Sequence, residues 1–232
     1  MGTSRTTVLI PGLTCDATFW AHQHSELIRR SRVVVPRLHD HDSLEAMAST
    51  ILSETSGPLD VVGHSMGGRV AFEVVRLASG RVRSLAVLDT GVHSAGADEP
   101  AQRQVRLDLA AAGGMESLAP DWVPALLHPD RRDDEALVGA ISEMVASYTV
   151  QQYRGQIRAL LERPDARPTL GSIACPTLVA VGRADTWSPV EQHREIESAI
   201  RGARLEIIED AGHMVAMEQP EVTTQLLVDW LR

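Results

Sequence analysis

Ser65 lies in a Gly-His-Ser-Met-Gly-Gly run at residues 63–68, and its hydroxyl is the first candidate for covalent chemistry. The run follows an apolar stretch, residues 59–62, and precedes a helix-like one, residues 69–78. Such a strand-to-helix turn exposes the serine hydroxyl, with glycines on both sides because larger side chains would collide with the strand and the helix. The following helix N-terminus would offer backbone N–H groups to a developing negative charge. An ordinary turn with a capping serine is the alternative for so short a pattern.

His213 and Asp185 are the candidate partners that could activate this serine. A serine hydroxyl is a poor nucleophile until a base removes its proton, and an imidazole does this well near neutral pH. His213 follows Gly212 in a turn, where the glycine lets the backbone bend and aim the ring. Asp185 ends a Gly-Arg-Ala-Asp run, and its carboxylate could accept the other ring N–H and stabilise the imidazolium. The three residues predict a Ser-His-Asp triad, in a chain order in which such triads occur.

Attack by a serine on a carbonyl group also needs two N–H donors for the oxyanion that forms. The backbone N–H of Met66, next after the serine, is expected to be one donor, and that of Leu13 the other. Gly12 would let the loop that carries Leu13 approach the site closely. The loss of one such donor typically lowers the rate by about 10²–10³.

The elements that position these residues alternate between apolar strands and helices. The expected strands are residues 6–10, 32–36, 59–63, 84–89, 176–182 and 204–209. The expected helices are residues 17–30, capped by Asp16, a segment capped by Asp42 or Ser43 that ends near residue 53, and residues 69–78, 189–200 and 220–231. This alternation predicts a mainly parallel sheet of about six strands with helices on both faces. Ser65, Asp185 and His213 all follow strand ends, and ligands bind at that edge of such sheets.

The alternation stops between about residues 93 and 168. This region instead holds amphipathic segments at residues 101–112, 122–127, 134–148 and 151–161, separated by glycines and prolines. We therefore expect a small helical cap at residues 93–168, inserted into a core made of residues 1–92 and 169–232.

Composition narrows the class of partner. The formal net charge of −9, with arginines scattered along the chain, argues against binding to nucleic acid or to an anionic membrane surface. No apolar stretch approaches the about 18 residues that span a bilayer, and the first strand begins too early for a signal peptide. Two cysteines, Cys15 and Cys175, are too few for a disulfide framework and suggest thiols in a reducing compartment. The chain is expected to be cytoplasmic, without membrane or nucleic-acid partners, as a monomer or homodimer.

The chain resembles the α/β-hydrolase superfamily over nearly its whole length. The matching pieces are Ile-Pro-Gly-Leu at residues 10–13, the serine run at residues 63–68, the segment from Gly182 to Pro189, and Ala-Gly-His at residues 211–213. These pieces are similar to those of small bacterial-type esterases with a helical cap. The resemblance implies the α/β-hydrolase fold, with Ser65 as nucleophile, His213 as base and Asp185 as acid.

Three departures from the superfamily pattern affect what the resemblance implies. Pro11-Gly12 replaces the usual His-Gly of the oxyanion loop, so no neighbouring imidazole is expected to support that loop. The common Asp-x-x-Gly-x-Gly stretch after the second strand is replaced by residues 36–42, so the resemblance does not assign a substrate. The chain also begins at what is usually the third strand, which agrees with about six core strands.

Several residues have two interpretations. Asp89, at another strand end, is a second candidate acid or a turn aspartate, and we favour Asp185. His93 is either a substrate-binding residue or a polar loop residue, and Cys15 either touches substrate or is a small buried hydrophobe. Three tryptophans either line an apolar pocket or belong to the core: Trp20, Trp122 and Trp187. Trp187 lies nearest Asp185 in the chain.

Two histidine pairs could suggest a metal. His39 and His41, next to aspartates, lack an identifiable third ligand, and a catalytic zinc usually takes three. His22 and His24 fall on an expected helix, where residues two apart do not share a face. We therefore expect no metal and no cofactor.

These features favour a serine hydrolase that cleaves a small-molecule carboxylic ester through an acyl-enzyme, with Gly12, Trp187 and His93 contacting the substrate. A thioesterase would use the same groups on a different leaving group. Alternatives are a lyase or a carbon–carbon bond hydrolase that uses the same triad, and a ligand receptor that kept the pocket but hardly turns over.

Overall fold

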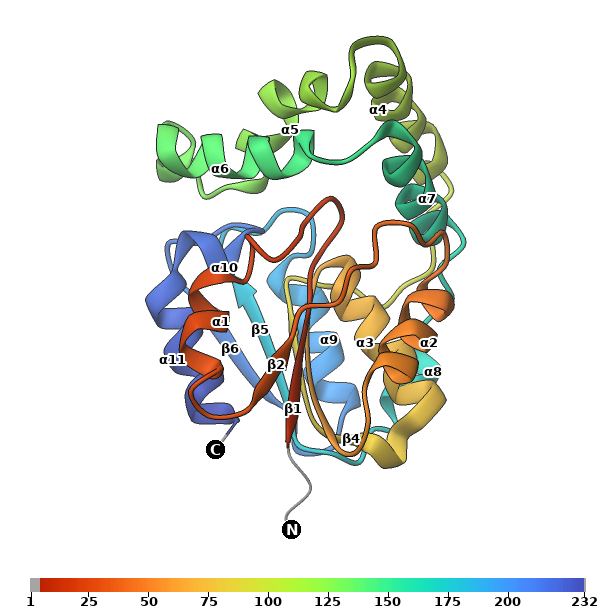
Figure 1. Ribbon diagram of the computed structural model, residues 1–232, viewed down its shortest axis with the longest axis vertical. Coiled ribbons are helices and arrows are strands. Elements are labelled where there is room, and N and C mark those ends of the chain that lie inside the picture. The colour runs from red at the N-terminus through yellow and green to blue at the C-terminus, as the bar shows by residue number, and fades with distance from the viewer. Residues whose placement is uncertain (1–4, 232) are drawn as a thin grey trace.

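The computed structural model describes residues 5–231, and a six-stranded parallel sheet runs through its centre (Figure 1). The expectation that no signal peptide precedes the first strand concerns residues 1–4, which lie outside the described residues. The strands are β1 (Thr6–Ile10), β2 (Arg32–Val34), β3 (Leu59–His64), β4 (Val82–Leu88), β5 (Thr177–Gly182) and β6 (Arg204–Ile208). They lie in the order β2-β1-β3-β4-β5-β6, and every neighbouring pair is parallel.

Burial of the strands follows their position in the sheet. The inner strands β1, β3 and β5 are buried along their whole length, which explains their continuous apolar sequences. The edge strands β2 and β6 are partly exposed. The prediction of about six parallel strands is confirmed, with β2 ending at Val34, two residues before Pro36.

Helices cover both faces of the sheet (Figure 1). One face is covered by α1 (Ala21–Leu27), α10 (Val215–Glu218) and α11 (Pro220–Trp230), whose apolar side chains join one buried cluster. The other face is covered by α2 (Leu44–Glu54), α3 (Met66–Ala78), α8 (Arg167–Leu170) and α9 (Val190–Ala199), which form a second cluster. Ser43 is the residue that caps α2, since its hydroxyl accepts from the N–H of Ala46 over 3.1 Å.

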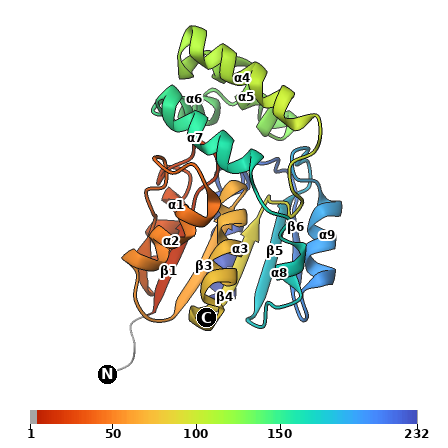
Figure 2. The ribbon, with the colours of Figure 1, turned by 90° about the vertical axis from the view of Figure 1, so that its right-hand side faces the viewer.

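Four helices lie beyond the carboxyl ends of the strands, as Figure 2 shows above the sheet. They are α4 (Glu99–Gly113), α5 (Ala119–Leu126), α6 (Glu135–Ala146) and α7 (Val150–Leu161). Leu107, Trp122, Ile141 and Tyr153 on these helices belong to the same buried cluster as the α1–α11 face. The helices therefore pack directly over the sheet edge at which the candidate residues were expected.

The structure differs from the predicted elements mainly at helix ends. The helix expected over residues 17–30 is shorter, because residues 16–21 form successive turns and the chain enters α1 only at Ala21. Asp16 caps these turns by accepting from the N–H of Thr18 over 2.7 Å. Short helical turns were not predicted; they are η1 (Ser79–Arg81), η2 (Met115–Leu118), η3 (Pro129–Arg131), α8 and α10. Within residues 5–231, no helix combines the length and apolar character needed to cross a bilayer.

Candidate active site

Ser65 occupies a strained turn between β3 and α3. Its backbone has φ 53° and ψ −117°, a left-handed conformation that costs energy in a residue with a side chain. The two flanking glycines are needed for close packing: a Cβ on Gly63 would overlap the carbonyl oxygen of Gly67, and one on Gly67 would overlap that of Ile10. Thr90 braces the turn by donating its hydroxyl to the carbonyl oxygen of Ser65 over 2.7 Å. The turn thus holds the Ser65 side chain at the sheet edge.

His213 lies between Ser65 and Asp185, although the three residues are far apart in the chain. Its Nε2 is 2.9 Å from the Ser65 hydroxyl oxygen, and its Nδ1 is 2.8 Å from Asp185 Oδ2. With Nδ1–H donated to the carboxylate, the unprotonated Nε2 can accept the serine proton. The structure therefore brings the three predicted residues into hydrogen-bonding contact, in the geometry that proton removal from Ser65 requires.

Asp185 is fixed by hydrogen bonds to its other oxygen. Its Oδ1 accepts from the backbone N–H groups of Trp187 and Ser188, over 2.8 and 3.0 Å. Burial alone would raise the pKa of Asp185, but the facing His213 ring and these two N–H groups hold that pKa below its ordinary value. A carboxylate that stays ionised can stabilise a positive charge on His213.

Asp89, the alternative acid, has a different environment. Its Oδ1 accepts from the backbone N–H of Gly182 over 2.9 Å, and its Oδ2 lies 3.9 Å from Nε2 of His64, beyond hydrogen-bonding distance. Burial, reinforced by the charge of Asp185, raises the pKa of Asp89 well above its ordinary value. The carboxyl oxygen that bonds to His213 belongs to Asp185, and Asp89 instead joins β4 to β5.

His64 contributes a contact that the sequence analysis did not anticipate. Its Nε2 donates to the backbone carbonyl oxygen of His213 over 2.7 Å, and its ring stacks on Phe19 with the ring centres 4.1 Å apart. Burial, together with the charge of His213, lowers the pKa of His64 to about 3, so the ring is neutral. The residue before the serine thus holds the backbone of the histidine that faces the serine.

The candidate oxyanion loop follows β1 and packs against the serine turn. A Cβ on Gly12 would lie 2.8 Å from His64 Nδ1 and 3.2 Å from Ser65 Cβ, so only glycine fits without displacement. Leu13 and Met66 both line the cavity that contains Ser65. The expectation that no imidazole neighbours this loop is wrong, because His64 lies directly against Gly12 although it is far away in the sequence.

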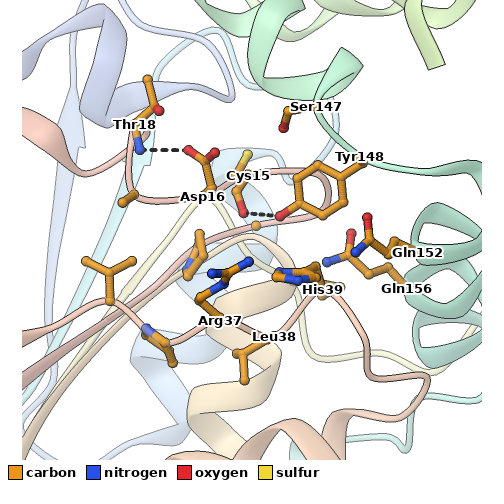
Figure 3. A pocket seen from close by; sticks show the side chains of 16 residues that line it. Cys15, Asp16, Thr18, Arg37, Leu38, His39, Ser147, Tyr148, Gln152 and Gln156 are labelled. Carbon is orange, nitrogen blue, oxygen red and sulfur yellow. Dashed lines mark hydrogen bonds between the residues drawn. The ribbon is translucent and has the colours of Figure 1, made fainter.

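Tyr148, between α6 and α7, and Gln156, on α7, hold the same loop, and Figure 3 shows the Tyr148 contact. The Tyr148 hydroxyl donates to the carbonyl oxygen of Cys15 over 2.6 Å, and the backbone N–H of Thr14 donates to Gln156 Oε1 over 2.9 Å. Thr14 has φ 53°, so the loop adopts an unusual backbone conformation that these contacts stabilise. The position of the loop therefore depends on the helices above the sheet.

A cavity of about 460 Å³ contains Ser65 and His213. Its walls come from the sheet edge and from α4 to α7, and they include two of the substrate-binding candidates, Trp187 and His93. Trp187 is 38% exposed, whereas His93 pairs with Glu195 over 2.8 Å. Although arginines are scattered along the sequence, four of them line this cavity. They are Arg69, Arg103, Arg106 and Arg163.

The remaining tryptophan and cysteine candidates separate into lining and core residues. Trp122 lines the cavity, whereas Trp20 is fully buried in the core with its ring nearly perpendicular to that of His64. Cys15 lines the cavity and is also buried, and burial raises the pKa of its thiol to about 12. Its thiol is therefore not ionised near neutral pH.

A second cavity, of about 340 Å³, lies beside the candidate oxyanion loop (Figure 3). Gly12, the predicted substrate contact in this loop, lines it, as do Arg37 and His39 after β2. Cys15 and Met66 line both cavities, so these two residues lie between the two spaces. Ser65 and His213 line the first cavity and are not among the lining residues of the second.

Glu218 organises the loop that carries His213. Its Oε1 accepts from the backbone N–H groups of Gly212 and Met214, over 2.9 and 3.1 Å, and its Oε2 accepts from that of His128, over 2.7 Å. The side chain is buried, and burial raises its pKa. One carboxyl group thus joins the His213 loop to the segment after α5. Sequence alone gives no signal for this contact, because Glu218 lies on an unpredicted short helix.

The histidines considered as metal ligands have protein partners. His41 Nε2 bonds to the Thr50 hydroxyl over 2.7 Å, and His39 Nε2 lies 3.2 Å from Asp40 Oδ2. Within residues 5–231, no three histidine, cysteine or acidic side chains gather closely enough to hold a metal ion. His22 bonds to Thr224 on α11.

Comparison with known proteins assigns the chain to a family. The model of the alpha/beta hydrolase family matches residues 7–226. A thermophilic esterase from Thermogutta terrifontis, solved with malate bound, has a TM-score of 0.89 and 30% identity, over 100% of this chain and 91% of that one. A Neisseria meningitidis pimeloyl-[acyl-carrier protein] methyl ester esterase is 25% identical over 81% of this chain and 75% of its own.

A longer relative also matches nearly the whole of this chain. The dihydrolipoyllysine-residue acetyltransferase component of the acetoin cleaving system of Pseudomonas putida is 29% identical over 97% of this chain. This chain spans only 63% of the length of that protein. The family match, the six-stranded fold and the esterase relatives agree, and the chain belongs to the alpha/beta hydrolase family.

Proposed function

We propose that the protein is a serine hydrolase that cleaves a carboxylic ester of a small molecule through an acyl-enzyme. Ser65 Oγ attacks the ester carbonyl carbon while His213 Nε2 takes the hydroxyl proton, and Asp185 stabilises the resulting imidazolium. The carbonyl oxygen becomes an oxyanion, which accepts hydrogen bonds from the backbone N–H groups of Leu13 and Met66. His213 then returns its proton to the alkoxide, which leaves as the alcohol.

Water completes the cycle. His213 removes a proton from water, the hydroxide attacks the acyl carbon, and the acid departs as the proton returns to Ser65 Oγ. Ester and water are thus converted to acid and alcohol with no other reactant. The cavity of about 460 Å³ that contains Ser65 and His213 leaves space for a small ester at the serine hydroxyl.

The single observation that carries the proposal is the pair of contacts made by His213, 2.9 Å to Ser65 and 2.8 Å to Asp185. Two of the relatives compared above are esterases, which supports an ester as substrate. We further propose that residues 93–168 form a cap that shapes the substrate cavity, since α4 to α7 supply one of its walls. Cys15 and Cys175 are both free, which supports a reducing compartment.

Steady-state hydrolysis of 4-nitrophenyl acetate and butyrate by the wild type and by Ser65→Ala tests this proposal. We expect the alanine variant to lose at least about 10³-fold in kcat. Ser188→Ala is the matched control, because Ser188 lines the same cavity but its backbone N–H, not its hydroxyl, bonds to Asp185. It should retain activity within about threefold of the wild type.

Two outcomes would contradict the proposal. Full activity in Ser65→Ala would exclude Ser65 as the nucleophile. Binding of an ester by the wild type without turnover would favour a receptor, the alternative from a different functional class.

A further inference from the structure

Four arginines from separate parts of the chain line the cavity that contains Ser65. Arg69 lies on α3, Arg103 and Arg106 lie on α4, and Arg163 follows α7. The acidic residues among the described lining residues are Asp98 and Glu99, so two positive charges are left unmatched. The whole chain has a formal net charge of −9, and this cavity therefore differs in sign from the rest of the protein.

Glu99 accounts for part of the cluster. Its carboxylate pairs with Arg103 and with Arg163, each at 2.6 Å. Burial alone would raise its pKa, but these two guanidinium groups lower the pKa of Glu99 to about 2. One carboxylate thus holds two arginines in place. Asp98, the other lining acid, is exposed to solvent.

Arg69 and Arg106 have no such carboxylate. Within residues 5–231, neither guanidinium has an acidic group within ion-pair distance. Arg69 donates through Nη1 to the backbone carbonyl oxygen of His93 over 2.9 Å. Burial, reinforced by the charge of Arg163, lowers the pKa of Arg69 to about 9, so it is still a cation near neutral pH. The charge of Glu99 also acts on Arg69, but from beyond ion-pair distance. A partly buried cation without an ion-pair partner is costly, and a bound anion would offset that cost.

Arg106 lies over the indole of Trp187, with its guanidinium carbon 5.1 Å from the ring centre. The Trp187 ring centre is in turn 6.4 Å from that of His213, and its Nε1 donates to the carbonyl oxygen of Ala125 over 3.1 Å. This stacking orients the Arg106 guanidinium while leaving its N–H groups available, since cation–π contact uses the face of the group. The second unpaired cation therefore lies close to the triad.

The position of Arg69 relative to Ser65 limits the ligand. Ser65 immediately precedes α3, and Arg69 lies about one helical turn further along, since its backbone N–H donates to the carbonyl oxygen of Ser65 over 3.3 Å. Both residues line the same cavity. A group held by Arg69 would lie a few bonds from a carbonyl carbon at Ser65 Oγ. Low-dielectric walls around the cavity strengthen such an interaction relative to bulk water.

We infer that the cavity binds esters that carry a separate carboxylate, with Arg69 and Arg106 as its counterions. The substrate class is a monoester of a short dicarboxylic acid, or an ester of comparable size with a carboxylate on its alcohol part. The ester part of this inference rests on the proposed function, whereas the carboxylate-binding site does not depend on it. Arg69 and Arg106 act as specificity-determining residues, and Glu99 positions Arg103 and Arg163 beside them.

The kinetic test compares monomethyl glutarate with methyl pentanoate, which has the same acyl chain length and no charge. We expect the wild type to prefer monomethyl glutarate. Arg69→Met should lower kcat/KM for that ester by about 30- to 100-fold, mainly through KM, and change methyl pentanoate by less than about threefold. Arg106→Met should act in the same direction, and Arg69→Lys should retain part of the preference. Equal losses for both esters, or a wild-type preference for methyl pentanoate, would overturn the inference.

Arg76→Met provides the matched control, because Arg76 lies on the same helix but pairs with Glu45 and Glu73 outside the cavity. It should leave the ratio of the two kcat/KM values unchanged. A change in that ratio as large as that of Arg69→Met would show that the ratio responds to net charge rather than to the cavity, and would overturn the inference.

A binding test separates this inference from the proposed function. Calorimetry of Ser65→Ala with glutarate needs no turnover, and binding should weaken at least about tenfold when Arg69→Met is added. Phosphate serves as the second probe. Binding of phosphate but not glutarate would overturn the carboxylate as the recognised anion and assign the site to a phosphate group. Binding of neither would overturn the inference even if ester hydrolysis is demonstrated. If the protein binds glutarate but hydrolyses no ester, the result would support the anion site and would contradict the proposed hydrolase function.

Discussion

The backbone N–H of His213 donates to the carbonyl oxygen of Leu126, the last residue of α5, over 2.7 Å. A Cβ on the preceding Gly212 would lie 2.7 Å from the same oxygen, so the two segments are in close contact. His213 faces Ser65, and Leu126 belongs to the helices above the sheet. This contact couples the position of α5 to that of the His213 backbone, and we expect movement of α5 to move the imidazole.

Glu218→Gln tests this coupling. The amide nitrogen would replace one carboxylate oxygen and face a backbone N–H of Gly212, Met214 or His128, so at least one hydrogen bond would be lost. We expect kcat to fall about tenfold with little change in KM, and the free energy of unfolding to fall by about 1–3 kcal/mol. Steady-state kinetics and urea unfolding would measure the two effects. The control is Glu221→Gln, at an exposed position on α11; an equal effect of that control would contradict the coupling.

The two buried aspartates should respond differently to removal of charge. Asp185→Asn removes the acceptor for His213 Nδ1–H, and we expect kcat on a 4-nitrophenyl ester to fall by about 10³–10⁴. Asp89→Asn should change kcat by less than about threefold, because Asp89 bonds to the Gly182 N–H and not to His213, and an amide oxygen can accept the same bond. The reverse order of effects would identify Asp89 as the acid.

Gly12→Ala tests the packing of the oxyanion loop. The added Cβ would meet His64 Nδ1 at 2.8 Å and displace either the ring or the loop that carries Leu13. We expect kcat to fall by about 10–10²-fold, with less effect on thermal stability. Gly80→Ala is the control, since a Cβ there has no neighbour within 4 Å. Unchanged kcat in Gly12→Ala would exclude this loop as a source of an oxyanion donor.

Burial of His193 should make stability depend on pH. Its Nε2 accepts from the Thr90 N–H over 3.0 Å, and burial lowers the pKa of His193 from 6.5 to about 4. The unfolded chain then binds a proton below pH 6.5 while the folded chain does not until about pH 4. The stability from this residue is therefore fully present above pH 6.5 and is lost as the pH falls to about 4, by the order of 3 kcal/mol.

Urea unfolding of the wild type and of His193→Gln at pH 7 and pH 4.5 would measure that loss. Glutamine can still accept from Thr90 but does not titrate, so the variant should lose less stability on acidification. His64, whose pKa is lowered to about 3, contributes to the loss in both proteins. His24→Gln, at a partly exposed position, should behave as the wild type does; equal acid sensitivity in all three proteins would contradict the account.

The sheet and the convergence of Ser65, Asp185 and His213 could be predicted because both depend on local signals. Apolar runs ended by glycine or proline mark the inner strands, and a parallel sheet brings the ends of such strands to one edge. The serine turn was equally predictable, since Gly63 and Gly67 fit a strand-to-helix bend in which larger side chains would overlap the backbone.

The contacts that hold the site together were not predictable from local pattern. His64 bonds to the carbonyl oxygen of His213, which is 149 residues away, and Gln156 bonds to Thr14, which is 142 residues away. Arg69 and Arg106 are isolated in the sequence, and they line one cavity only in the folded chain, where α3 and α4 each supply one of them. Such contacts follow from tertiary approach, which the spacing of residues along the chain does not specify.

Labelling with a fluorophosphonate tests the central claim most directly, because the reagent forms a covalent bond with an activated serine hydroxyl. Peptide mass spectrometry of the treated protein should find one adduct, on Ser65, with ester hydrolysis lost in proportion to labelling and no adduct in His213→Ala. Unmodified Ser65 in a protein that still hydrolyses esters, or inactivation by an adduct at another residue, would contradict the account.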